Sequence, residues 1–357
     1  MTAYRETAFR SSVQFACQDQ SDFFTAAKNP VKYPLPECVL KMLDEPVIAS
    51  DLPVLVIGAA GMDMVGRLKS SLRPYTSNPA QIRLSFGGAA RNVAENLLHL
   101  GTPVTLLTVL GNDEIGNNLN DAIAESGANV EGILRSTQYP TGSYLAVVNT
   151  DGKLAYGLDD MRVITELTPE HIRAKEDLFS NSSLLFIDAN LPKETLRSVI
   201  SLARKKKLPI CADPTSEELA PKLIKYLHHL KLVVPNLNEA AILCNRKSGI
   251  NTRREAIDAA KCLVSQGVET AIVTMAEAGV CYATSETSGY VPPVRIQITD
   301  PTGAGDALTA AVLFGLLNDM PIDDAVRLGV AAASLTLTYR GSVIPDLSLE
   351  KLYDQLG

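Results

Sequence analysis

From Pro53 onward, short apolar runs alternate with longer segments of helical period. The short runs are rich in β-branched residues and predict buried strands at residues 54–57, 104–109, 184–188, 210–213, 232–235 and 271–274. Helices are expected at residues 90–100, 115–126 and 253–266, and a glycine follows each one where a left-handed C-cap is common. This repeated order predicts an α/β fold, with a mostly parallel sheet covered by helices on both faces.

Two regions show a strand period without helices between the strands. Residues 68–84 and 142–158 alternate as extended strands do, and an Asp151-Gly152 turn divides the second region. We expect them to form a small β-sheet lid beside the main sheet, from segments near 68–85 and 139–162. Residues 1–52 are polar and interrupted by prolines. We interpret them as an N-terminal extension or linker before a domain at 53–357.

The composition is that of a soluble globular protein, with 46% hydrophobic and 20% charged residues among 357. Its 33 basic and 40 acidic side chains give a net charge of −7, which excludes the broad positive field that backbone-driven nucleic-acid binding needs. No apolar run approaches the roughly 18 residues of a membrane helix. We therefore expect small-molecule ligands, with neither a nucleic-acid polymer nor a membrane as partner.

The cysteines and histidines indicate neither a zinc site nor a disulfide framework. The six cysteines are scattered without a Cys-x-x-Cys pair, and the chain has four histidines. The first ten residues mix charges and contain no apolar stretch, so no secretory signal is expected. The prediction is a cytoplasmic protein with reduced thiols.

The stretch from Asp300 to Asp306 carries the strongest chemical signal in the chain. Its glycines precede an apolar helix at 307–317, so the first helical amides stay free. Free amides and the helix dipole make a site for an anion, such as a phosphate in a charged transition state. Asp306 would lie beside that site, where a carboxylate can accept the proton of an attacking hydroxyl. The alternative is a tight turn in which Asp306 only caps the helix.

Two further patterns point to a ligand that carries hydroxyl groups. Gly87 and Gly88 precede a helix and permit close approach of a ligand, while Asn92 offers a donor and an acceptor to a sugar hydroxyl. Asp63 follows the first strand, where ligands of open sheets bind and a carboxylate can hold a pair of hydroxyls. Each pattern also has a structural interpretation, as a turn before a helix or as a solvated loop aspartate.

Two common nucleotide-binding motifs do not occur in the chain. The Gly152-Lys153 pair has neither the upstream glycine nor the following Ser or Thr of a Walker A loop. Gly58-Ala59-Ala60-Gly61 is not the Gly-x-Gly-x-x-Gly fingerprint of a dinucleotide fold. A redox Rossmann enzyme is therefore a remote alternative.

Taken together and in this order, the patterns resemble the ribokinase-like family, also called phosphofructokinase-B type carbohydrate kinases. The resemblance covers residues 54–344. Residues 87–92 match the family's N-terminal signature, residues 300–306 its C-terminal signature, and residues 236–239 its Asn-x-x-Glu motif. The resemblance implies a three-layer α/β/α fold with a mostly parallel central sheet and a small β-sheet lid.

For chemistry, the resemblance implies ATP-dependent phosphorylation of a sugar hydroxymethyl group, with magnesium and a monovalent cation such as potassium. Asp306 would be the catalytic base, beside an anion hole formed by the amides of three residues. The other implied residues are Gly303, Ala304 and Gly305 for the anion hole; Asp63, Gly87, Gly88 and Asn92 for the sugar; Asn236, Glu239, Thr274 and Gly279 for the nucleotide; Glu239, indirectly, for magnesium; and Asp300 and Thr302 for potassium.

Within the family, several segments are similar to pseudouridine kinases in particular. They are residues 77–79, 83–85, 91–97, 141–146 and 159–161. The implied reaction converts pseudouridine to pseudouridine 5′-phosphate. Two positions depart from the family pattern. Gly61 stands where relatives often have Asn, two residues before the first-strand aspartate, and Ala276 replaces the middle glycine of a Thr-x-Gly-x-x-Gly nucleotide loop.

Other functions on the same fold stay open at this point. One is a kinase for ribose, fructose, adenosine or another sugar or nucleoside. The other is a non-catalytic binding protein, which the departures at Gly61 and Ala276 favour and an intact Asp306 disfavours. Lid strands of relatives often pair between subunits, and hairpin edges need cover, so we also expect a homodimer.

Overall fold

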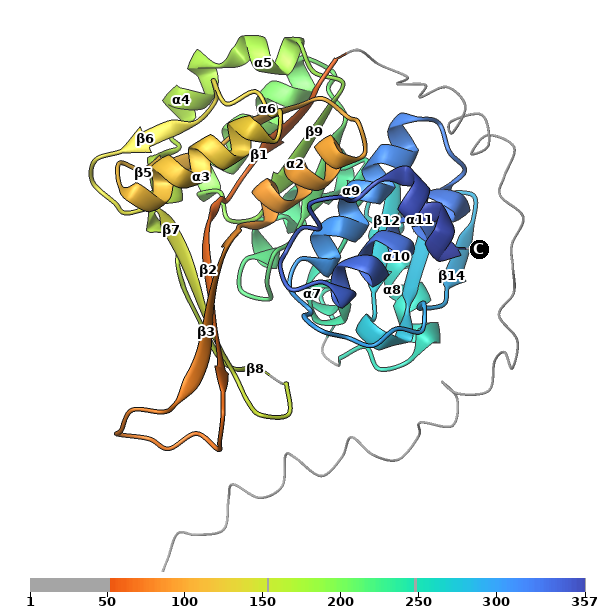
Figure 1. The fold of residues 1–357 in the computed structure, drawn as a ribbon. Helices are drawn as coiled ribbons and strands as arrows, with labels where there is room; N and C mark the ends of the chain where they lie inside the picture. Colours follow the sequence, from red (N-terminus) through yellow and green to blue (C-terminus); the bar gives the residue numbers. More distant parts are fainter. Residues whose placement is uncertain (1–51, 153, 247–248, 357) are drawn as a thin grey trace, which may run out of the picture. The chain divides into compact units, whose positions relative to one another are not determined.

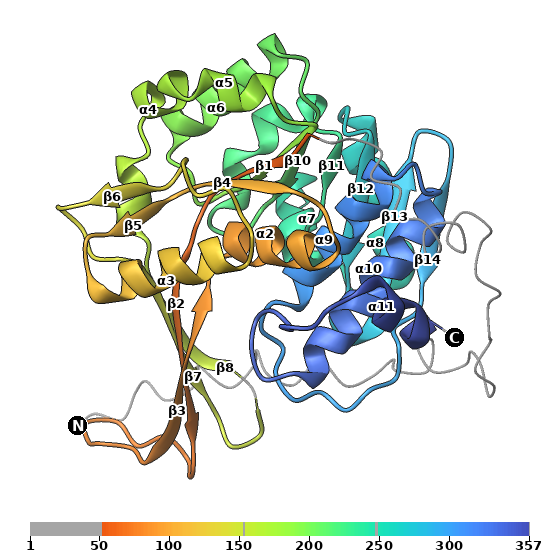
Figure 2. The same ribbon diagram turned by 45° about the horizontal axis from the view of Figure 1, so that its top comes forward.

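The computed structural model describes residues 52–152, 154–246 and 249–356. The strands of its main sheet are β1 (Val54–Ile57), β4 (Val104–Leu107), β9 (Leu184–Asp188), β10 (Ile210–Asp213), β11 (Leu232–Val233), β12 (Thr270–Thr274), β13 (Val280–Thr284) and β14 (Ser288–Val291). In space they follow the order β14-β13-β12-β11-β10-β9-β1-β4 (Figures 1 and 2). Neighbours from β4 to β12 are parallel, and β12, β13 and β14 are antiparallel.

Helices cover both faces of this sheet. They are α2 (Ala89–His99), α3 (Glu114–Glu125), α4 (Pro169–Ala174), α5 (Glu176–Ser180), α6 (Lys193–Lys205), α7 (Leu237–Leu243), α8 (Arg253–Ser265), α9 (Ala304–Leu317), α10 (Ile322–Thr338) and α11 (Leu349–Leu356). Helices α2, α3, α9, α10 and α11 contribute to the core on one face, and α4 to α8 to the core on the other. Figure 2 shows these layers from a second side.

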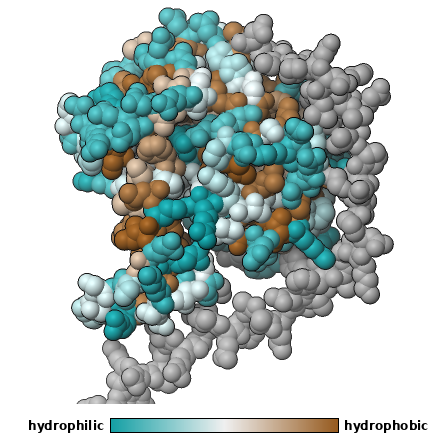
Figure 3. All heavy atoms as spheres, viewed as in Figure 1, coloured by the Kyte–Doolittle hydropathy of each residue, from teal (hydrophilic) through white to brown (hydrophobic). Residues whose placement is uncertain are grey.

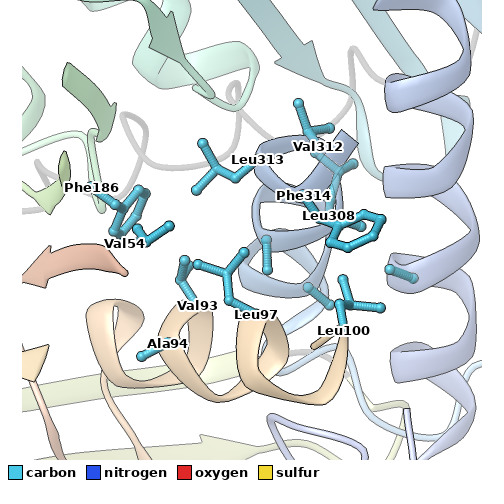
Figure 4. Close-up of a cluster of buried hydrophobic side chains, with 14 of the residues drawn as sticks. Val54, Val93, Ala94, Leu97, Leu100, Phe186, Leu308, Val312, Leu313 and Phe314 are labelled. Atoms are coloured by element: carbon cyan, nitrogen blue, oxygen red, sulfur yellow. The ribbon is translucent and has the colours of Figure 1, made fainter. Parts of the chain in front are cut away.

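Strand β1 explains why the sheet needs helices on both sides. Val54 and Val56 point into one core, whereas Leu55 and Ile57 point into the other, and all four are fully buried. A continuous apolar run of this kind is typical of a parallel strand buried on both faces. Figure 4 shows the first core, where β1 meets the apolar faces of α2 and α9.

A second sheet forms the lid. Its strands are β2 (Gly61–Leu68), β3 (Ala80–Gly87), β7 (Gly142–Val148) and β8 (Leu154–Asp160), in the order β3-β2-β7-β8. Strand β2 is antiparallel to β3 and parallel to β7, and β7 is antiparallel to β8. Figure 1 shows this sheet projecting from the layered body. Because only three residues separate β1 from β2, the lid extends from the carboxyl end of the main sheet.

The predicted α/β fold, its parallel sheet and its lid are confirmed, with differences in detail. The strand expected at 104–109 is divided, because the chain leaves the main sheet after β4 and pairs as β5 (Val109–Gly111) with β6 (Leu134–Ser136). The lid starts at Gly61, earlier than expected. Helix α10 and the hairpin of β13 and β14 were not among the expected elements. The predicted extension at 1–52 lies almost entirely outside the described residues.

The structure also bears on the expectations about membrane-spanning helices and about the cysteines. Within the described ranges, no helix is both long and apolar enough to cross a membrane. Cys211, Cys244, Cys262 and Cys281 are free thiols, whereas Cys17 and Cys38 lie outside the described residues. Burial raises the pKa of the Cys211 thiol to about 12, so it stays protonated at neutral pH.

Candidate active site

The glycine-rich stretch forms the start of helix α9. Gly303 is the N-cap and adopts a left-handed conformation, with φ of 77°. A Cβ atom at this position would also lie 2.0 Å from the carbonyl oxygen of Ser342, so only glycine fits. The helix then begins at Ala304 without a side-chain cap at its N-terminus. Its first amides are therefore available to an anion.

Asp306 lies in the first turn of α9 and meets a residue of α2. The Nδ2 atom of Asn92 donates a hydrogen bond of 2.8 Å to the Oδ2 atom of Asp306. Burial raises the pKa of Asp306 to about 7; the Asn92 hydrogen bond and Arg91 oppose the rise, while Asp63 and Asp188 add to it. A carboxylate with a pKa near neutral can accept a proton at physiological pH.

Arg91 fixes the orientation of the Asn92 amide, a role that sequence analysis missed. Its Nη1 atom donates to the Oδ1 atom of Asn92 at 3.2 Å and to the carbonyl oxygen of Phe86 at 3.3 Å. The same guanidinium forms an ion pair with Glu95, one turn along α2. With its oxygen engaged by Arg91, Asn92 presents its NH₂ group to Asp306. No local pattern marks this role, because it depends on where α9 lies.

Asp63 belongs to lid strand β2 and is 7% exposed. Burial raises its pKa to about 6, against the lowering effect of Arg91 and Arg83. A side chain at Gly87, on the neighbouring strand, would displace the Asp63 carboxylate, because a Cβ atom there would lie 2.1 Å from the Asp63 Oδ2 atom. Sequence analysis placed Asp63 just beyond the first strand, with a solvated loop as the structural alternative, whereas the structure places it inside the lid sheet. A ligand held by Asp63 would therefore contact the lid directly.

Asp63 forms a row of polar residues across the lid. Strand register sets it opposite Ser85 on β3 and Tyr144 on β7, and Tyr144 stands opposite Asp159 on β8. Directly opposed residues share a face of a sheet, so all four side chains lie on one side. Burial and the nearby Asp63 and Asp159 raise the pKa of the Tyr144 hydroxyl, which therefore stays protonated. This face offers several hydrogen-bonding groups beside Asp63.

The departure at Gly61 has a steric cause. Gly61 is paired with Gly142 of β7, and a Cβ atom at position 61 would lie 2.4 Å from the Gly142 carbonyl oxygen. No asparagine fits there while the strands keep this register. Gly88 is constrained similarly, with φ of 96° and the Ala59 carbonyl oxygen 2.5 Å from its ideal Cβ position. Both glycines bring the backbones around Asp63 and Asn92 close together.

Asp188, at the end of β9, is hydrogen-bonded to the β1–β2 connection and to the start of α2. This carboxylate ends β9 and is 0% exposed. Its Oδ2 atom accepts hydrogen bonds from the amides of Ala59 at 2.7 Å and Ala90 at 3.2 Å, and its Oδ1 atom from Asn190 at 2.9 Å. Burial raises the pKa of Asp188, and these donors oppose the rise. The side chain thus holds the β1–β2 connection against the start of α2.

A cavity of about 560 Å³ lies beside the glycine-rich loop and the start of α9. The predicted nucleotide residues Asn236, Thr274 and Gly279 line it, together with Gly305 and largely apolar side chains. A deep, mostly apolar pocket beside free helix amides suits a base joined to phosphates. Ala276 also lines the cavity, and its φ of 49° is the left-handed conformation that the glycine of relatives adopts readily.

The Asn-x-x-Glu motif is the N-terminus of helix α7. Asn236 caps this helix by accepting from the amides of Asn238 and Glu239, and the Glu239 carboxylate accepts from the Asn236 amide at 2.8 Å. Burial raises the pKa of Glu239. Asp213, missed by sequence analysis, has a pKa raised well above its usual range by burial and by the nearby Glu239 and Asp306.

Magnesium fits this acidic region as a partner shared with a nucleotide. No group of three His, Cys, Asp or Glu among the described residues could hold a metal ion alone. Magnesium, however, commonly uses one or two carboxylates, water and phosphate oxygens. Burial is the main cause of the raised pKa of Asp213, and a divalent cation near Glu239 and Asp213 would relieve the repulsion that adds to it.

Asp300, expected to help bind potassium, already has a partner on each oxygen. Its Oδ2 atom lies 2.6 Å from the Nη2 atom of Arg83, and its Oδ1 atom accepts from the Thr302 amide at 3.0 Å. The guanidinium neutralises the carboxylate in this conformation. Potassium binding at Asp300 and Thr302 stays a prediction, in which the ion would share the carboxylate with Arg83.

Comparisons with known proteins agree with this geometry. A family model described as pfkB family carbohydrate kinase matches residues 52–348. Pseudouridine kinase from Escherichia coli (strain K12) is 29% identical over 299 residues, which are 83% of this chain and 94% of that protein. Guanosine-inosine kinase from Exiguobacterium acetylicum is likewise 29% identical over 297 residues, which are 82% of this chain and 97% of that protein.

The fold has close structural counterparts as well. A chain from E. coli solved in complex with ATP and Mg²⁺ superimposes with a TM-score of 0.74 at 19% sequence identity, covering 85% of this chain and 99% of its own. At that identity the likeness shows the fold alone.

Proposed function

The chain belongs to the pfkB family of carbohydrate kinases, and from that premise we propose that it transfers the γ-phosphoryl group of ATP to the hydroxymethyl group of pseudouridine. The product is pseudouridine 5′-phosphate. The observation that carries the proposal is Asp306, a carboxylate with a pKa of about 7 in the first turn of α9, hydrogen-bonded to Asn92.

The proposed chemistry follows from the position of Asp306. Its carboxylate accepts the proton of the 5′-hydroxyl while that oxygen attacks the γ-phosphorus, and the bond from phosphorus to the ADP oxygen breaks. The amides of Gly303, Ala304 and Gly305 donate to the oxygens of the transferring group, where negative charge is spread. Asp63 and Asn92 hold sugar hydroxyls and orient the acceptor.

ATP and magnesium are the proposed cofactors. The apolar cavity lined by Thr274, Ala276 and Gly279 would hold the base, and the α9 amides the phosphates. Magnesium would neutralise phosphate charge, with Glu239 acting through water and Asn236 keeping Glu239 in place. Potassium at Asp300 and Thr302 remains a prediction, tested by exchanging KCl for NaCl at constant ionic strength; no step of the proposed reaction depends on it.

Pseudouridine is proposed from two supports. The E. coli pseudouridine kinase matches most of both chains, and the row of Ser85, Tyr144 and Asp159 beside Asp63 suits a polar base. A purine nucleoside is the second candidate, because the guanosine-inosine kinase has the same identity to this chain. Ribose or fructose would leave that polar row with little to bind.

We also propose a homodimer formed through the lid. The face opposite Asp63 carries exposed apolar side chains, among them Ile82 (71%), Leu84 (59%), Tyr156 (59%) and Leu158 (61%). Figure 3 shows apolar atoms gathered on the lid. Edge strands β3 and β8 also need cover. A second copy supplies a matching face, so Leu84→Arg should give a monomer in sedimentation, and an unchanged mass would contradict the dimer.

The test of function measures ATP consumption with magnesium across pseudouridine, uridine, adenosine, guanosine, ribose and fructose. Phosphorus NMR then identifies the phosphorylated position. We expect the highest kcat/KM with pseudouridine and phosphate on the 5′-oxygen. A preference for guanosine or ribose keeps the chemistry and overturns the substrate. ATP binding without turnover on any acceptor favours a non-catalytic binding protein. The cytoplasmic location stays a prediction that localisation of the full chain would test.

A further inference from the structure

Lid strand β3 reaches across the site to the glycine-rich loop. Arg83, near the middle of β3, forms an ion pair of 2.6 Å with Asp300, 217 residues away in sequence. The Arg83 and Asp300 side chains are 29% and 12% exposed. Register places Arg83 opposite Val65 and Ser85 opposite Asp63, so Arg83 and Ser85 lie on the substrate face of the lid. The contact therefore joins the lid face that carries Asp63 to the segment that leads into Gly303.

Asp300 divides its two oxygens between lid and loop. While Oδ2 meets Arg83, Oδ1 accepts the Thr302 amide at 3.0 Å and closes the turn that leads into Gly303. Pro301 between them has no amide hydrogen to stabilise another turn. The Asp300 carboxylate thus sets the course of the chain just before the anion-hole amides. A shift of this carboxylate would shift those amides.

A second contact ties β3 to the far end of the same loop. Ser342 donates from Oγ to the carbonyl oxygen of Phe86 on β3 at 2.9 Å. The Ser342 backbone packs so closely on Gly303 that no side chain fits at Gly303. The Phe86 carbonyl oxygen also accepts from Arg91, which orients Asn92 toward Asp306. One lid strand is therefore connected to the loop at two points and to the base through α2.

Arg83 also has a donor left over. Its Nη1 atom is buried and has no hydrogen-bond partner among the described residues. A buried unpaired donor is unfavourable, and an oxygen of a bound ligand would satisfy it. Arg83 is two residues from Ser85, which stands opposite Asp63, so Arg83 and Asp63 lie on the same face of the lid.

We propose that Arg83 is a positioning residue that couples acceptor binding to the anion hole. One arm of its guanidinium binds an acceptor oxygen, and the other holds Asp300, so the lid and the amides of Gly303, Ala304 and Gly305 take up their working arrangement together. This inference rests on the proposed phosphoryl transfer. An isolated pair of partly exposed charges would contribute little, so a large, coupled effect distinguishes the two roles.

The kinetic test is a double-mutant cycle with Arg83→Gln, Asp300→Asn and the double variant, on the acceptor that wild type turns over fastest. Misplacing catalytic groups by about 1 Å can reduce rates ~100-fold, so each single variant should lower kcat roughly 10- to 100-fold with the KM for ATP nearly unchanged. The double variant should be no slower than the worse single variant.

Two further variants serve as controls. Arg83→Lys should recover part of the rate, and Arg67→Gln, at an exposed arginine of β2, should match wild type.

Additive effects in the cycle would overturn the coupling and would indicate that Asp300 acts apart from Arg83, for instance through a potassium ion. An Arg83→Gln rate equal to that of Arg67→Gln would also contradict it. Melting temperatures and ATP affinity within error of wild type establish that the variants are folded.

A second readout needs no acceptor and no turnover. Hydrogen exchange of the amides from Thr302 to Asp306 should be about tenfold faster in Arg83→Gln than in wild type, and unchanged in Arg67→Gln. Equal exchange in all three proteins would contradict the proposal. This result stands even where pseudouridine proves not to be the acceptor, so failure of the proposed substrate and failure of the coupling are separate outcomes.

Discussion

The main sheet and the lid sheet use their two faces differently. In β1 of the main sheet, Leu55 and Val56 on opposite faces are both fully buried. In β3 of the lid, Arg83 faces the site, whereas Leu84 on the other face is 59% exposed. Both faces of a main-sheet strand therefore pack in a core, whereas the two lid faces differ. The polar face contacts the glycine-rich loop through Arg83 and Asp300, and the exposed apolar face is the surface that the proposed dimer would bury.

Matched substitutions in the two sheets should separate these roles. Leu55→Ala creates a cavity between layers, so the free energy of unfolding should fall by about 2–5 kcal/mol. Leu84→Ala removes an exposed side chain, so unfolding measured at high dilution should change by no more than about 0.5 kcal/mol. Urea titrations of both variants provide the check. Equal losses would mean that the lid face is part of the folded core, against the comparison.

The pH dependence of kcat/KM tests the role of Asp306 in the polar site next to the lid. Asp306 must be ionised to act as a base, so kcat/KM should be retained above a pKa of about 7 and lost as pH falls through it. Asn92→Ala removes a hydrogen bond that favours the ionised form, and the acidic limb should move upward by about one pH unit. Asn118→Ala, at an exposed position of α3, should leave the limb in place. An unmoved limb in Asn92→Ala would assign the titration to another group.

The smallest expected effect concerns the nucleotide side. Ala276 has a left-handed φ of 49°, which is unfavourable by roughly 1–2 kcal/mol for a residue with a Cβ atom. Glycine removes that strain but adds unfolded-state entropy, so Ala276→Gly should stabilise the protein by less than about 1 kcal/mol. Ala278→Gly in the same turn lacks the strain and should destabilise it. Thermal melts decide, and a shift of the same sign in both variants would refute the strain argument.

The sequence was most informative where the signal is local. Strand β1 and helix α8 follow from period and capping alone, as do the left-handed glycines after α2 and α3. The glycine-rich loop and Asp306 could likewise be identified from adjacent residues. Glycines directly before an apolar helix are enough to predict free helix amides with a carboxylate beside them.

The rest depends on contacts between distant parts of the chain. The role of Arg83 depends on its ion pair with Asp300, 217 residues later in the sequence. The role of Asp188 depends on the hydrogen bonds that it accepts from the amides of Ala59 and Ala90. Asp63 was expected just beyond the first strand and outside the hairpin region that begins at residue 68. Pairing with β3 and β7 makes this segment a strand, which no local pattern could indicate.

The most direct test of the central claim is the turnover of Asp306→Asn. Asparagine keeps the size of the side chain but cannot accept the hydroxyl proton as a carboxylate does. We predict a fall in kcat of about 10²- to 10⁴-fold, with the acceptor KM and ATP binding largely kept. Near-normal turnover in this variant would remove Asp306 from the mechanism and return the glycine-rich loop to a structural role.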